Sequence, residues 1–191
     1  MSDRLYLSCW TKNYDKVSML RRYQALLETF PFSKLSQRAQ VLRVFAVSYS
    51  EPIALEKSLE PGTTVDDVIS AARDFTDADC CVELEAAWDL WQYSDDWKLE
   101  PAAVTLSCLG PDFESGHDDH LRIDFGLDNK FLPMPEITGA IKMQESNLRS
   151  LLHLVADIDT ALPLSRRHLW SESGANFAEL LAKAVGKFDV H

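Results

Sequence analysis

Residues 81–92 read CVELEAAWDLWQ, and this stretch decides the fold because its composition and its pattern predict different structures. Glutamate, alanine and leucine are good helix formers, so propensity alone favours a helix. The apolar residues, however, recur at every second position from Cys80 to Leu90. A helical period of 3.6 residues would not produce that alternation, whereas a strand with one buried face requires it. The pattern therefore predicts a long β-strand.

The segments around this strand predict the other elements of an α+β protein. Alternating or β-branched stretches predict strands over residues 5–10, 41–49, 53–59, 102–109 and 120–125. One-sided apolar stripes predict helices over residues 19–30, 64–75, 148–162 and 177–185. We expect the segment SRRHLWSESG, residues 165–174, to link the last two helices.

The order of these elements predicts a fold class. It matches a ferredoxin-like βαββαβ core with an antiparallel sheet, extended by a C-terminal β-hairpin and followed by two helices. We expect residues 1–135 to form the α+β sheet domain. Residues 136–191 would form a C-terminal helical extension packed on the same core, so that the chain is a single domain overall. The order of elements alone implies no activity.

The composition is that of a folded protein. Of the 191 residues, 46% are hydrophobic, which is enough to build a core without disulfides or metal. No apolar run approaches the ~18 residues that a membrane-spanning helix needs. The first residues, MSDRLYLSCWT, lack the apolar core of a signal peptide. We therefore expect a cytoplasmic protein whose four cysteines are reduced.

The charge is concentrated in one segment. The net charge is −11, and the segment from Asp74 to Asp128 holds 15 acidic residues against two basic ones, Lys98 and Arg122. That segment therefore carries −13, and the rest of the chain carries +2. Because such a segment repels phosphate groups, we expect no direct binding of nucleic acid through it.

The outward face of the predicted sheet is the candidate binding surface. By alternation, three successive strands place polar and charged side chains there, together with one tryptophan. We expect Arg122 to bridge carboxylates across the strands. The alternative is an ordinary solvated sheet face, or a face that the terminal helices cover. The candidate binding residues are Glu83, Glu85, Asp89, Trp91, His120, Arg122 and Asp124.

A second candidate is the motif GHDDH at residues 116–120, which contains two histidines and two aspartates. Zinc needs three or four convergent ligands, and this spacing in a loop does not fix their directions. A polar run beginning with glycine is typical of the connection between two strands. We therefore interpret the motif as a solvated hairpin tip, and we predict neither a metal ion nor another cofactor. His120 is kept as a site residue because it begins a strand.

The favoured function is a non-catalytic cytoplasmic interaction protein. Its acidic sheet face would engage a basic protein partner, in an inhibitor- or immunity-like role. The sequence contains no phosphate-binding glycine loop and no nucleophile motif, so no catalytic residue is predicted.

Two alternatives remain open. The chain could be a small-ligand-binding protein or an enzyme that uses a carboxylate, histidine and arginine pocket on the same sheet face. It could also form a homodimer through its C-terminal helices. In that case the basic cluster Arg166, Arg167 and His168 of one copy would meet the acidic face of another.

Overall fold

A computed structural model gives the structure of the chain and describes residues 3–132, 137–173, 176–179 and 181. Within these ranges, seven strands form one antiparallel sheet in the order β3-β2-β4-β5-β6-β1-β7. The strands are β1 (Arg4–Thr11), β2 (Gln40–Ala46), β3 (Leu55–Leu59), β4 (Cys80–Tyr93), β5 (Trp97–Leu109), β6 (Leu121–Leu127) and β7 (Leu164–Ser171).

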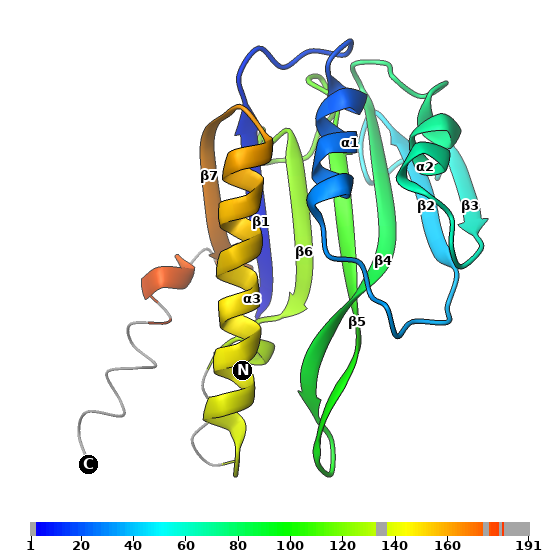
Figure 1. The fold of residues 1–191 in the computed structure, drawn as a ribbon. Helices are drawn as coiled ribbons and strands as arrows, with labels where there is room; N and C mark the ends of the chain where they lie inside the picture. Colours follow the sequence, from blue (N-terminus) through cyan, green and yellow to red (C-terminus); the bar gives the residue numbers. More distant parts are fainter. Residues whose placement is uncertain (1–2, 133–136, 174–175, 180, 182–191) are drawn as a thin grey trace.

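Three α-helices and one short 3-10 helix accompany the sheet in the described ranges. They are α1 (Met19–Thr29), α2 (Val65–Ala72), α3 (Ala140–Ala161) and the 3-10 helix η1 (Asp128–Lys130). Figure 1 shows α1, α2 and α3 on the same face of the sheet. Helix α2 begins with a capping box, in which Thr64 and Asp67 each bond the other's backbone N–H. The molecule therefore has one layer of strands and one layer of helices.

The alternation from Cys80 to Leu90 forms the long strand that the pattern predicts. β4 pairs with β5 from Cys81↔Leu109 to Tyr93↔Trp97, and this hairpin extends beyond β2 and β6 in Figure 1. Its inward residues are buried, and Trp88 lies at the centre of an aromatic cluster. The Trp88 ring centroid is 5.8 Å from that of Phe30 and 5.9 Å from that of Phe125. The tertiary packing of an alternating face thus overrides helix propensity here.

The predicted ferredoxin-like core is wrong. That fold would place the first strand beside the strand that follows the second helix, which is β4. In the structure the neighbours of β4 are β2 and β5, and β1 lies between β6 and β7. The physical reason is the length of the β4–β5 hairpin, because β5 occupies one edge of β4 along almost its whole length. β6 then pairs with β5, and β1 is displaced two strands outward.

The predicted arrangement of the C-terminal segment is also wrong. Residues 165–174 were expected to link two helices, but Leu164–Ser171 form β7, which pairs with β1 from Leu5↔Ser171 to Thr11↔Leu164. Only Ser171 of β7 is fully buried, so the sequence of this strand lacks the apolar alternation of an inner strand. This pairing gives hydrogen-bond partners to backbone N–H and C=O groups that β1 would otherwise expose at the edge of the sheet. Of the helix predicted over 177–185, residues 177–179 and 181 are described and are helical, and the rest lies outside the described residues.

Among the residues that the structure describes, no helix combines the length and the hydropathy that crossing a membrane requires.

Candidate functional site

The face of the sheet opposite the three helices is called the open face below. The strand register places polar side chains on it in two adjacent rows that cross the five strands β4, β5, β6, β1 and β7. The first row is Glu83, Ser107, Arg122, Ser8 and His168. The second row is Glu85, Thr105, Asp124, Tyr6 and Trp170. Four of the predicted site residues therefore lie in these rows, two on β4 and two on β6, on either side of β5.

Arg122 is held by Asp119 and does not bridge carboxylates across the strands as predicted. Its Nε and Nη2 donate to the two oxygens of Asp119 at 2.7 and 2.5 Å. The Asp119 side chain is fully buried, and Ser8 Oγ donates to it at 2.6 Å. Trp170 Nε1 in turn donates to Ser8 Oγ at 3.0 Å. This network joins β6, β1 and β7 beneath the loop that precedes β6.

Glu83 is bound by two hydroxyl groups. Ser107 Oγ donates to its Oε1 at 2.9 Å, and Tyr49 Oη donates to the same oxygen at 2.8 Å. Ser107 comes from the neighbouring strand β5, whereas Tyr49 comes from the segment that follows β2. The carboxylate is therefore fixed in place by donors that carry no charge.

The other two carboxylates of the rows are paired with arginines. Arg43 donates to Glu85 at 2.7 Å and to Glu56 at 2.7 Å, so it connects β4 with β3. Arg4 donates to Asp124 through Nε at 2.9 Å and through Nη2 at 2.5 Å. The open face thus holds ordered carboxylates, several of which already have a cation beside them.

Asp89 lies further along β4 and anchors the segment between α1 and β2. It accepts a short hydrogen bond from Ser33 Oγ and a second one, at 2.9 Å, from the N–H of Lys34. The N–H of Ser33 also donates to the backbone oxygen of Ala87 at 2.7 Å. Asp89 therefore has a structural role in fixing residues 33–40 against the edge of β4.

Trp91 is half-buried near the far end of the hairpin. Asn147 of α3 accepts the N–H of Trp91 and donates to its backbone oxygen, both at 2.9 Å. The same amide group donates to the backbone oxygen of Lys130 at 2.9 Å. Helix α3 thus contacts the backbone of Trp91, and it lies on the same face of the sheet as α1 and α2 (Figure 1).

His120 is engaged with residues that follow or end β1. Its ring stacks on Tyr14 with centroids 4.0 Å apart, and its Nδ1 accepts the N–H of Thr11 at 3.0 Å. Burial lowers the pKa of His120, and the nearby Asp119 partly opposes that shift. The side chain is therefore part of the packing at the end of the sheet rather than a partner of Glu83 or Glu85.

The GHDDH segment is more ordered than a solvated hairpin tip. Asp119 is buried, whereas Asp118 is exposed and has a left-handed φ of 54°. The ring of His117 lies 4.9 Å from that of Trp170. Since the polar side chains of the motif have separate partners or face solvent, they do not converge. In the described part of the chain, no three His, Cys, Asp or Glu side chains are grouped so as to hold a metal ion.

The loop between β5 and β6 covers one end of the open face. Phe113 of this loop packs with Cys81 and Leu109, and Phe45 of β2 lies against the same cluster. The N–H of Glu114 donates to the backbone oxygen of Val47 at 2.8 Å. This small second core limits the open part of the sheet to the two polar rows and to the region beyond them.

The predicted basic cluster is engaged within the chain. The guanidinium of Arg166 lies 3.8 Å from the ring centroid of Trp10, and Arg167 donates to Asp159 of α3 at 2.7 Å. His168 and Trp170 are both on β7, and their rings stack with centroids 6.4 Å apart. The cluster therefore packs on β1 and α3 and not on the acidic strands.

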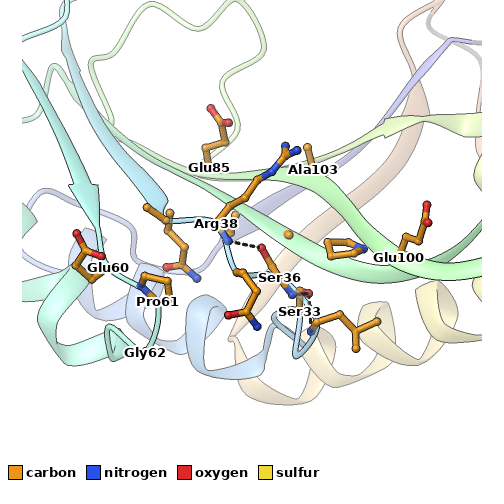
Figure 2. Close-up of a pocket in the computed structure, with 16 residues that line it drawn as sticks. Ser33, Ser36, Arg38, Glu60, Pro61, Gly62, Glu85, Glu100 and Ala103 are labelled. Atoms are coloured by element: carbon orange, nitrogen blue, oxygen red, sulfur yellow. Dashed lines mark hydrogen bonds between the residues drawn. The ribbon is translucent and has the colours of Figure 1, made fainter.

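A groove lies at the edge of β4, where β2 no longer pairs with it. The groove has a volume of about 550 Å³ and opens between residues 33–40, the segment 60–62 and strands β4 and β5. Its lining includes Glu60, Glu85, Glu100 and Arg38. Figure 2 shows Arg38 extending past the strands toward Ala103. The groove was not predicted, because it depends on how the 33–40 segment folds back on β4.

Several residues of this surface had no signal in the sequence. Asp119 meets Ser8, which lies 111 residues earlier, and Arg4 meets Asp124 across 120 residues.

Comparison with protein-family models, with curated proteins and with solved structures finds no match to this chain.

Proposed function

We propose that the chain is a non-catalytic cytoplasmic binding protein whose open face engages a basic protein partner, in an inhibitor- or immunity-like role. The observation that supports this most directly is the one-sided helix layer. Helices α1, α2 and α3 all lie on one face of the seven-stranded sheet, and none of them lies on the face that carries Glu83, Glu85 and Asp124. An antiparallel sheet with one polar, uncovered face is available to a partner.

The charge distribution supports a basic partner. Strands β4, β5 and β6 all come from the segment between Asp74 and Asp128, whose formal charge is −13. Opposite charge on a partner would steer the encounter and would raise the association rate more than it tightens the complex. Capture of the partner should therefore depend strongly on ionic strength.

The ordering of the carboxylates supports a binding role as well. Glu83 is fixed by Ser107 and Tyr49, and Glu85 is fixed by Arg43. Side chains that are already ordered lose less conformational entropy on binding than free ones. A basic partner would therefore meet acceptors that are in place before it arrives.

The test is capture of a partner from native lysate by the intact chain, with identification by mass spectrometry. We expect a basic protein that is lost at high salt and lost with the double variant Glu83→Gln and Asp124→Asn. The matched control neutralises Glu28 and Asp157 on the helices, which changes the net charge equally. Capture that is the same for both double variants would contradict the proposal.

Self-association through the C-terminal segment is a second proposal. Ile141 and Leu152 of α3 are 53% and 49% exposed, which leaves apolar side chains on the outer surface of that helix. A dimer that buries them should be visible by light scattering, and it should dissociate when both are changed to glutamine. A monomer at all concentrations and at low salt would contradict this second proposal.

A further inference from the structure

The groove beside β4 has a definite construction. Its floor includes Ala87 and Ala103, which face each other in the register of β4 and β5. Its outer wall is the segment 33–40, held to β4 by the bonds from Ser33 and Lys34. Its volume of about 550 Å³ lies within the ~300–1,000 Å³ that is usual for ligand sites.

Of the four charged side chains that line the groove, only one has an ion-pair partner among the described residues. Glu85 is bound by Arg43. Glu60 and Glu100 form no ion pair with any residue that the structure describes, and neither does Arg38. In Figure 2 the carboxylates of Glu60 and Glu100 lie on opposite sides of the groove, with Arg38 between them. With three glutamates and one arginine, the lining has a formal charge of −2.

The edge of β4 at the groove also has no strand partner among the described residues. β2 pairs with β4 only from Val41↔Glu85 to Ala46↔Cys80, so the strand is unpaired on that side beyond Glu85. Part of this edge is already bonded, by the N–H of Ser33 to the oxygen of Ala87 and by Asn147 to the backbone of Trp91. An occupant of the groove would therefore be recognised mainly by the negative charge of the lining.

We propose that this groove receives an arginine-bearing segment of a protein partner, and that Arg38 competes with that arginine for the same carboxylates. The inference rests on the proposed binding function, and it names the part of the surface that recognises the partner. The alanine floor accommodates the aliphatic stem of an arginine, and its guanidinium bonds Glu60 or Glu100. Arg38 forms no ion pair with Glu60 or Glu100, but its charge lies between them and opposes a second cation there.

The experiment is an NMR titration of the intact chain with a capped pentapeptide of alternating serine and arginine. The amide signals of Ala87, Glu100 and Ala103 should shift on binding. The variant Glu60→Gln/Glu100→Gln should bind about fivefold more weakly, as expected for two partly exposed ion pairs. Arg38→Gln should bind about twofold more tightly, because it removes a competing cation.

The matched control is Glu28→Gln/Glu145→Gln, which removes the same charge from the helices and should leave the affinity unchanged. Equal weakening by the control pair and by the groove pair would overturn the proposal, and so would weaker binding by Arg38→Gln. A peptide of alternating serine and glutamate should not shift the three amides, and shifts from it would also count against the groove. Neither Glu83 nor Asp124, the two residues changed in the lysate experiment, lines the groove. The groove can therefore fail while the wider binding function stands.

Discussion

Asp119 and Arg122 form a two-pronged ion pair in which the aspartate side chain is completely buried and the arginine side chain is 13% exposed. Arg122 belongs to the first polar row of the open face, and Asp119 belongs to the loop that precedes β6. Asp119 also accepts a hydrogen bond from the hydroxyl of Ser8. The ion pair therefore connects β1 to β6 in addition to the backbone pairing of these strands. The arginine of the open face is therefore a fixed structural element and not a free cation.

Asp119→Asn is expected to destabilise the protein by about 3 kcal/mol, because it leaves a largely buried guanidinium without its counter-charge. Urea denaturation measures the change. Asp118→Asn is the matched control, since Asp118 is exposed and asparagine tolerates its left-handed φ of 54°. We expect almost no change from the control, and similar losses for the two variants would refute the structural role of the pair.

Asn147→Ala is expected to loosen the far part of the β4–β5 hairpin. The variant leaves the N–H and the oxygen of Trp91 without their side-chain partner, at about 1–3 kcal/mol for a buried polar group left unsatisfied. Hydrogen exchange should become faster for the amides of residues 90–100. Ser146→Ala changes the exposed neighbour on the same helix and should leave those rates as they are. Unchanged exchange in Asn147→Ala would show that α3 does not hold the hairpin.

The pH dependence of stability should show a contribution from His120. Burial lowers its pKa in the folded state, so the unfolded chain binds the proton at higher pH. The contribution is therefore complete above the ordinary pKa of about 6.5 and is lost as the pH falls through that value toward the lowered one. Wild type should lose stability more steeply below about pH 6.5 than His120→Gln does. His153→Gln, at an exposed position, should keep the wild-type slope, and parallel curves for all three proteins would contradict the assignment.

The four cysteines are expected to react slowly in the folded protein. Cys9, Cys80, Cys81 and Cys108 are all buried, and burial raises the pKa of Cys9 and Cys108 to about 12. Thiol reagents attack the thiolate, which is then scarce at neutral pH. A colorimetric thiol assay should detect four thiols in denaturant and a much slower reaction without it. Rapid reaction of the native protein would show that the thiols are accessible.

Much of the secondary structure was predictable from the sequence, because each prediction rests on local geometry. The alternation from Val82 to Leu90 identifies β4 despite its helix-forming composition. The cap at Thr64 and the aspartates after it mark the start of α2. β7 was missed because an exposed edge strand has no buried face that would impose an apolar pattern.

The candidate site was predictable only in part. Alternation places Glu83, Glu85, Arg122 and Asp124 on one face, and the register of β4, β5 and β6 brings them together. The partners of these residues were not predictable, because Arg122 is bound by the aspartate of a loop that the pattern presents as solvated. His120 belongs to the alternating set in the sequence but packs on Tyr14 at the end of the sheet.

The sequence by itself determined which residues of each strand face the core and where most of the negative charge lies. Both follow from the two-residue period of a strand and from simple counting. Only the tertiary structure decided the order of the strands, the side on which the helices pack and the groove at the edge of β4. These depend on hydrogen bonds and contacts between segments that lie 120 residues apart or more, such as Arg4 with Asp124 and Ser8 with Trp170. A local sequence pattern shows that a segment forms a strand, but it does not show which distant strand that segment pairs with.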